Sequence, residues 1–156
     1  MRMPLDLLPV LWGEYLSDKN EFYTLKGYSS MGEQDAITSA MEDYLEMICR
    51  ISSDGQIVRI KHLSELLHVR PSSASKMAAV LKERGLIEFE KYGHITLTER
   101  GERMGAALLH RHELLHRFFC LINQSDNELT LVEKIEHFID DDTVKNIEVW
   151  LDRINT

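Results

Sequence analysis

The segment from residue 61 to residue 98 constrains the fold most, because the spacing of its apolar residues changes from helical to alternating within one short stretch. A short break separates two helical patterns, and Pro71 suits the first turn of the second helix. Gly85 suits the residue that follows the C-terminus of that helix. The two alternating stretches that come next are typical of a β-hairpin. The predicted elements are helices at about 61–68 and 71–84, then strands at 86–90 and 94–98.

Helix, short turn, helix and two-stranded hairpin together form a winged helix-turn-helix, whose second helix enters the major groove of DNA. The charge distribution favours this interpretation. The chain carries a formal net charge of −8, yet residues 59–91 contain seven basic and four acidic residues, so this segment is +3 and the remainder is −11. Basic residues gathered in one module of an acidic chain indicate that this module binds nucleic acid. The alternative is a winged-helix fold that is used for protein contacts.

Small polar and basic residues surround the predicted start of the second helix, which is the end nearest the bases. The serines there are also good helix caps. The tip of the hairpin can reach a phosphate of the DNA backbone. The candidate DNA-contacting residues are Arg70, Ser72, Ser73, Ser75 and Lys76 at the helix start, and Lys91 and Tyr92 at the hairpin tip.

Helical spacing returns on both sides of this unit, so the chain is predicted to be mainly α-helical. The last helix is short but has a broad apolar face that includes Val144, Trp150 and Leu151. Such a face predicts packing on a partner, for example the same helices of a second copy in a homodimer. The flanking helices are predicted at about 35–51 and 99–122, around 133–137, and after the acidic run 140–142.

Composition excludes several classes of protein. Hydrophobic residues make up 44% and charged residues 28% of the chain, which is ordinary for a soluble globular protein. No apolar run approaches the roughly 20 residues that span a bilayer, and the N-terminus lacks the pattern of a secretory signal. The sequence therefore predicts a cytoplasmic protein without membrane contact. Cys49 and Cys120 are far apart in helical patterns, which favours reduced, buried thiols.

Residues 1–34 differ from the rest of the chain. Prolines and glycines interrupt them, which argues against long helices. They also hold several aromatic residues, among them Trp12, Tyr15 and Phe22. A typical disordered tail has fewer aromatic residues. We therefore expect an N-terminal extension that docks on the body of the protein.

The helical pattern around residue 135 carries the first candidate metal ligands. Residues three and four apart share a helix face, so Glu133, Glu136 and His137 are predicted to converge on one side. Two carboxylates and an imidazole are ligands suited to manganese, iron or zinc rather than copper(I). The alternative is a solvated acidic face with a single histidine, because short metal-binding patterns have many false positives.

Two other helices carry residues of the same chemical kind. Asp43 and Glu46 lie about one turn apart on the first helix, opposite its apolar stripe. Taken alone, they suit a solvated face. His112 lies on the apolar stripe of the helix at 99–122, where a histidine is more often a hydrogen-bonded core residue than a ligand. Asp43, Glu46 and His112 become candidate metal ligands only when they are considered together with the other motifs of the chain.

Four motifs give the chain a family resemblance when they are taken together and in this order. From about residue 37 to residue 153 the chain resembles the diphtheria toxin repressor family of metal-activated transcription repressors, in particular its manganese-responsive branch. The motifs are Met41–Glu46, Arg70–Ser73 with Lys76 and Met77, Arg111–Leu115, and Glu133–His137.

The resemblance implies a dimer that binds operator DNA and holds two Mn²⁺ ions per chain between its domains, where Fe²⁺, Co²⁺, Cd²⁺ or Zn²⁺ can substitute. The iron-responsive branch tends to carry methionine, arginine and cysteine where this chain has Asp43, Glu46 and Glu133. Oxygen ligands at those positions favour a harder ion. The manganese branch often has a second histidine where this chain has Phe138. The ligands that the resemblance implies are Asp43, Glu46, His112, Glu133, Glu136 and His137.

The sequence thus predicts a winged helix-turn-helix DNA-binding domain over 35–100, preceded by the extension over 1–34 and followed by an all-helical dimerisation and metal-binding domain over 101–156. The predicted function is manganese-activated repression of metal-ion uptake genes, with no enzymatic activity and no small-molecule substrate. The alternatives are an iron-responsive repressor of the same family, a dinuclear metalloenzyme, and a protein-interaction module with a structural metal.

Overall fold

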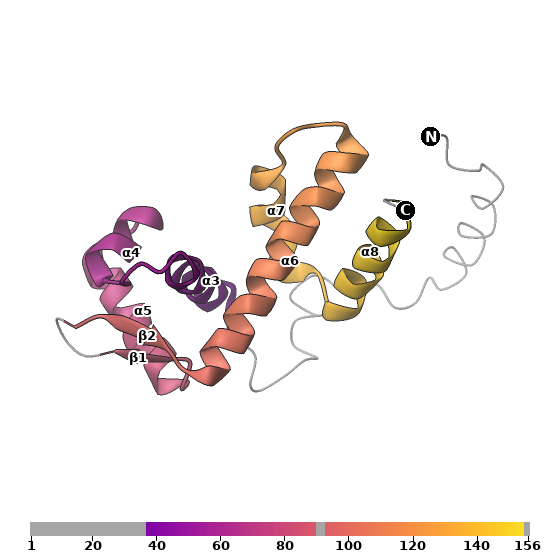
Figure 1. Ribbon diagram of the computed structural model, residues 1–156. Helices are drawn as coiled ribbons and strands as arrows, with labels where there is room; N and C mark the ends of the chain where they lie inside the picture. The colour runs from indigo at the N-terminus through magenta and orange to yellow at the C-terminus, as the bar shows by residue number, and fades with distance from the viewer. Residues whose placement is uncertain (1–36, 90–92, 155–156) are drawn as a thin grey trace, which may run out of the picture. The chain divides into compact units, whose positions relative to one another are not determined.

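The computed structural model describes residues 37–89 and 93–154 (Figure 1). The predicted extension over 1–34 lies outside these residues. The chain is mainly helical, with one two-stranded antiparallel sheet, as the sequence predicted. The elements are α3 (Ser39–Ser53), α4 (Ile60–Leu66), α5 (Pro71–Glu83), β1 (Ile87–Phe89), β2 (Ile95–Leu97), α6 (Glu99–Asn123), α7 (Leu129–Ile135), the 3₁₀ helix η2 (Glu136–Phe138) and α8 (Asp141–Ile154).

Helices α3 to α5 and the hairpin form the winged helix-turn-helix. The strands pair so that Ile87 faces Leu97 and Phe89 faces Ile95, which puts the alternating apolar side chains on the buried side. Pro71 occupies the first turn of α5, and Gly85 follows that helix with a φ of +66°. A positive φ is open to glycine without steric cost, so the helix ends there.

Three details of this unit differ from the prediction. The serines do not cap α5, because Arg70 is the N-cap residue and its side chain makes no capping hydrogen bond. Leu66 and Val80 lie in the apolar helical patterns of α4 and α5, which predict buried side chains, yet they are 43% and 38% exposed. Ala78 is fully buried on α5 instead. The apolar stripe of α5 is therefore narrower than the helical spacing indicated.

One hydrophobic core holds the winged unit together, and it includes the start of α6. Leu45, Ile48, Leu63 and Leu81 are each fully buried in it, and Leu108 of α6 completes it. Farther along α6, Leu114 packs with Val144 and Leu151 of α8 in a second cluster. Helix α6 therefore belongs to both cores and links the winged unit to the C-terminal helices (Figure 1).

Two glycines allow α6 to approach the winged unit closely. A Cβ at Gly101 would lie 1.9 Å from the carbonyl oxygen of Leu86, and one at Gly105 would lie 2.7 Å from Cβ of Cys49. Thr98 begins the helix by accepting a 3.0 Å hydrogen bond from the N–H of Gly101. The crossing of α3 and α6 is thus fixed at backbone contact, which places the acidic face of α3 against α6.

The acidic run ends one element and begins another, as predicted. Asp140 caps α8 by accepting a 2.8 Å hydrogen bond from the N–H of Thr143. Helix α8 buries Val144 and Leu151, while Val149 and Trp150 stay 48% and 42% exposed. Dimerisation through this face stays a prediction. None of the described helices is long and apolar enough to cross a membrane. Both cysteines are free thiols, but only Cys49 is buried, and Cys120 is half-buried.

Candidate metal centre and DNA interface

Helix α3 supplies three carboxylates that face α6 and η2. Thr38 caps this helix by accepting a hydrogen bond from the N–H of Met41, at 3.3 Å. The side chains of Glu42 and Glu46 are 19% and 12% exposed, and that of Asp43 is 43% exposed. The prediction that α3 presents acids opposite its apolar stripe is confirmed, but this face is covered by other helices and is not freely solvated.

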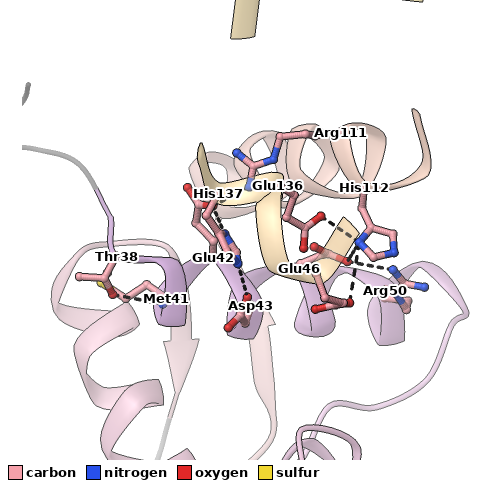
Figure 2. Close-up of polar contacts among 11 residues, drawn as sticks. Thr38, Met41, Glu42, Asp43, Glu46, Arg50, Arg111, His112, Glu136 and His137 are labelled. Carbon is pink, nitrogen blue, oxygen red and sulfur yellow. Dashed lines mark hydrogen bonds and ion pairs between the residues drawn. The ribbon is translucent and has the colours of Figure 1, made fainter. Parts of the chain in front are cut away.

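His112 gathers carboxylates from three elements, α3, α7 and η2, around one ring nitrogen. Its Nδ1 lies 2.9 Å from Oε2 of Glu136, 3.7 Å from Oε1 of Glu46 and 3.9 Å from Oε1 of Glu133. His112 and Glu136 are both buried, at 4% and 1% exposure. Single ligand atoms of Glu46, His112 and Glu136 all lie within 4.8 Å of one another. We call these three residues, which Figure 2 shows together, the His112 cluster, and we include Glu133 because of its 3.9 Å approach to His112.

His137 forms a second group beside the first. Its Nε2 lies 2.9 Å from Oδ1 of Asp43, and its Nδ1 lies 2.7 Å from Oε2 of Glu42. We call Asp43 and His137 the His137 pair. Figure 2 shows the two groups next to each other along α3, with the His137 pair toward the start of that helix and the His112 cluster farther along it.

The His112 cluster and the His137 pair are separate groups because the motif Glu133–His137 is not one continuous α-helix. Helix α7 ends at Ile135, and Glu136 begins the 3₁₀ helix η2. A 3₁₀ turn winds more tightly than an α turn, which changes the direction of successive side chains. Glu136 therefore reaches His112 while His137 reaches Asp43, and Glu133 keeps a 60% exposed side chain. The single helical face that the spacing predicted for these three residues does not form.

Burial and hydrogen bonding shift the protonation of the centre. Burial raises the pKa of the Asp43 carboxyl, and it raises the pKa of the Glu46 carboxyl against the opposing effect of the Arg50 hydrogen bond. The hydrogen bond with Glu136 raises the pKa of the His112 imidazole despite its burial. Without a metal, protons thus partly compensate the negative charge of the centre. A cation that displaces them would compensate that charge more fully.

The donor set fits a divalent cation. Carboxylate oxygens and imidazole nitrogens from three elements converge within the reach of one ion in the His112 cluster. Among the described residues of this cluster there is no sulfur ligand, and the Cys49 thiol packs against Gly105 instead. Hard oxygen ligands with one imidazole suit manganese or iron(II) better than copper(I). The arrangement could join α3 to α6 and η2 through a bound ion.

Sequence reasoning missed three residues that contact the candidate ligands. Arg50 donates a 2.8 Å hydrogen bond to Oε1 of Glu46. Glu42 bonds to His137, and Arg111 donates a 2.5 Å hydrogen bond to Oε2 of Glu42. Glu42 and Arg111 stand directly before Asp43 and His112 in the sequence. Their place inside two of the motifs was a signal, but helical spacing alone gave them no role.

The start of α5 presents most of the candidate DNA contacts to solvent. In winged helix-turn-helix proteins the residues at this end of the second helix contact base edges in the major groove. Ser75 is half-buried and less accessible. Lys91 and Tyr92 lie outside the described residues. The exposed candidates are Arg70, Ser72, Ser73 and Lys76.

A winged helix-turn-helix that shares its long helix with a carboxylate–histidine centre defines a metal-dependent DNA-binding regulator. The comparison with known families gives the same class. Residues 36–95 match the family described as iron dependent repressor, N-terminal DNA binding domain, and residues 98–156 match its metal binding and dimerisation domain. The chain therefore belongs to the iron-dependent repressor family, whose members are transcription regulators and not enzymes.

Relatives and solved structures agree with this membership. The HTH-type transcriptional regulator MntR of Lysinibacillus sphaericus (strain C3-41) is 36% identical over 111 residues, which are 70% of this chain and 80% of the relative. MntR of Geobacillus kaustophilus (strain HTA426) is 38% identical over 103 residues, 65% of this chain and 73% of the relative.

Two solved structures have a similar fold. The structure of the manganese regulator SloR has a TM-score of 0.64 at 24% identity, over 74% of this chain and 55% of that one. A manganese-dependent transcriptional repressor in complex with manganese has a TM-score of 0.56 at 28% identity, over 71% of this chain and 52% of that one. This chain thus spans about half the length of the two solved chains.

Proposed function

We propose that this chain is a manganese-activated transcription repressor that binds operator DNA as a homodimer in the cytoplasm and controls genes for metal-ion uptake. The observation that carries the proposal is the convergence of Glu46, His112 and Glu136 from α3, α6 and η2. An ion bound there would join the winged unit to the helices that follow it. Relatives named MntR and a solved manganese-dependent repressor support the choice of manganese.

We further propose that each chain holds two ions. The His112 cluster, including Glu133, would hold one of them. The His137 pair would hold the other ion. Bound divalent cations supply positive charge between the carboxylates. Fe²⁺, Co²⁺, Cd²⁺ or Zn²⁺ could substitute, because selection of Mn²⁺ by oxygen and nitrogen ligands depends on geometry and metal availability rather than on raw affinity.

Activation would follow from charge. Asp43 and Glu46 on α3 face Glu133 and Glu136 on α7 and η2, so their repulsion loosens the contact between these elements when no cation is bound. Cations bound on both sides would fix the orientation of the winged unit. In a homodimer the two α5 helices would then match half-sites spaced by roughly 34 Å, one turn of DNA. By linkage, operator binding must tighten metal binding by the same factor.

The decisive test is metal-dependent binding of the full chain to a labelled fragment from upstream of a manganese-transporter gene. Fluorescence anisotropy would be recorded with Mn²⁺, with Fe²⁺ under anaerobic conditions, and with chelator. We expect tight binding with Mn²⁺, weaker activation by Fe²⁺, and non-specific affinity with chelator.

Each alternative gives a different result in this experiment. Equal binding in chelator would exclude metal activation and favour a structural metal. A preference for Fe²⁺ at equal free concentration would identify an iron-responsive repressor. Metal binding without any operator affinity would reopen the metalloenzyme and protein-interaction hypotheses.

A further inference from the structure

A partly buried ion pair lies beside the His137 pair and is not part of the proposed ligand set. Arg111 of α6 donates a 2.5 Å hydrogen bond to Oε2 of Glu42 on α3. Their side chains are only 11% and 19% exposed. A second pair of the same residue types on α6, Arg103 with Glu99, has the same 2.5 Å separation but is 67% and 87% exposed. Exposed pairs of this kind contribute little to stability, whereas the partly buried Arg111–Glu42 pair is shielded from solvent and can hold its two side chains in place.

The same oxygen of Glu42 also contacts His137. Oε2 of Glu42 lies 2.7 Å from Nδ1 of His137, and the opposite ring nitrogen, Nε2, lies 2.9 Å from Asp43 (Figure 2). A carboxylate at Nδ1 makes that nitrogen a hydrogen-bond donor. The lone pair of Nε2 is then the one available to a cation next to Asp43. Carboxylate, histidine and metal commonly form such a chain in proteins, and the carboxylate orients the ring.

Arg111 in turn fixes Glu42. Its Nε is a buried donor that has no hydrogen-bond partner among the described residues, while Nη2 of the same guanidinium donates to Glu42. The ion pair also joins α6 to α3 without any metal. Glu42 is thus held from one side by the guanidinium of Arg111. It presents a fixed acceptor to His137 on the other side.

We propose that Glu42 and Arg111 are positioning residues, which orient His137 so that Nε2 faces Asp43 and thereby set the affinity of the second ion alone. The inference rests on the proposed function, because it concerns one of the two proposed metal positions. The His112 cluster does not depend on this pair, since no contact of Glu42 or Arg111 with His112, Glu46 or Glu136 is found among the described residues. A substitution of Glu42 should therefore weaken the binding of the second ion and leave the binding of the first ion unchanged.

The first arm of the test is metal-independent. In the metal-free full chain, the Nδ1 proton of His137 is expected to give a downfield, slowly exchanging NMR signal. The signal should be absent in Glu42→Gln and His137→Ala and present in the matched surface control Glu99→Gln. Absence of this signal from the wild type, or its survival in Glu42→Gln, would overturn the positioning role even if metal binding proved correct.

The second arm measures Mn²⁺ stoichiometry by calorimetry. We expect the wild type and Glu99→Gln to bind two ions, and Glu42→Gln to bind one ion with unchanged affinity and the other about 10–100-fold more weakly, as outer-shell substitutions do. If Glu42→Gln weakened the binding of both ions to the same degree, Glu42 would have a merely structural role and the inference would be overturned. If Glu42→Gln failed to fold, Glu42→Asp, which keeps the charge, should show the same selective loss. If the wild type gave the NMR signal but bound no Mn²⁺, the proposed function would be refuted, while the hydrogen bond between Glu42 and His137 would be confirmed.

Discussion

The two histidines of the centre differ in what surrounds them. His112 is buried and presents one nitrogen to carboxylates of α3 and η2, whereas both nitrogens of His137 face carboxylates of α3. The position of His112 on the apolar stripe of α6 allowed a hydrogen-bonded core residue as an alternative. In the structure its ring is buried and hydrogen-bonded to Glu136, and its role as a metal ligand stays a prediction. Its loss should therefore affect stability and metal binding together.

Substitution of His112 by alanine should destabilise the metal-free protein by about 1–3 kcal/mol, because Glu136 would be left buried without its hydrogen-bond partner. Mn²⁺ affinity of the His112 cluster should fall as well. The measurements are urea unfolding in chelator and calorimetric titration with Mn²⁺. His110→Ala is the matched control, since His110 is exposed on the same helix and pairs with Glu148. Unchanged stoichiometry and affinity in the His112 variant would refute the cluster.

Substitution of Asp43 by methionine tests metal choice with little effect on folding. Asp43 is half-exposed, so its replacement should change stability by no more than roughly 0.5 kcal/mol. Methionine removes a hard oxygen ligand and offers a soft sulfur, so activation by Mn²⁺ should weaken relative to Fe²⁺ or Co²⁺. Operator affinity would be measured against the free concentration of each metal. An unchanged order of metals and an unchanged midpoint would show that Asp43 belongs to a solvated face.

At the scale of elements, α6 connects the two halves. It shares one core with α3 and another with α8, and its glycines bring it into backbone contact with the winged unit. Glu46 and His112 stand on opposite sides of the α3–α6 contact. The geometry of the metal centre therefore depends on how closely these two helices approach.

Gly105→Ala should be destabilising although alanine favours helices. The gain in helix propensity is about 1 kcal/mol. The added Cβ would lie 2.7 Å from Cβ of Cys49, an atom that cannot rotate away, so α6 must shift. Overpacking of this kind costs about 1–3 kcal/mol. Mn²⁺ affinity should fall with the shift, and Cys49→Gly should restore part of it in the double variant. A Gly105→Ala protein with higher stability and unchanged Mn²⁺ affinity would contradict the close-contact argument.

Helix α5 should read the operator mainly through its exposed first turns. Lys76→Ala is expected to weaken operator binding and to reduce the slope of log affinity against log salt by about one unit, because one phosphate contact is lost. Lys145→Ala on α8 is the control, since this lysine pairs with Asp142 away from the winged unit. The comparison is made in saturating Mn²⁺. Equal slopes for the wild type and Lys76→Ala would place the DNA-binding surface elsewhere.

At the scale of the whole molecule, local patterns predicted most of the fold. The bounds of α5 and of the hairpin depend on local signals, namely Pro71, Gly85 and the alternation of apolar residues in the strands. The winged unit could therefore be predicted from the sequence. The end of α7 at Ile135 does not, because helical periodicity continues through Glu136 and His137 and only tertiary contacts favour the 3₁₀ turn. The Arg111–Glu42 pair joins residues 69 positions apart, a contact that spacing cannot predict without an alignment of homologues.

The protonation of the centre gives the whole molecule a pH dependence. Asp43, Glu46 and His112 all have pKa values raised above their ordinary 3.8, 4.5 and 6.5. The folded metal-free protein therefore binds more protons than the unfolded chain. Stability from such groups is present at low pH and is lost as pH rises through their folded pKa values. The pKa values of Glu128 and Asp140 are lowered, so the stability that these carboxylates contribute is lost as pH falls. This loss occurs only below their ordinary pKa values.

Between about pH 5 and pH 8, the metal-free protein should therefore lose stability as pH rises, since Asp43, Glu46 and His112 hold their protons to higher pH in the folded protein than in the unfolded chain. Mn²⁺ must displace the same protons, so its affinity, and with it the increase in Tm at a fixed Mn²⁺ concentration, should grow with pH. Thermal unfolding across this range, with Mn²⁺ and with chelator, measures both effects. Glu46→Gln should reduce the pH dependence in chelator, because it removes one carboxylate with a raised pKa. If the metal-free protein instead became more stable with rising pH, or if the Mn²⁺-induced change in Tm were the same at pH 5 and pH 8, protons and metal would not compete for one centre.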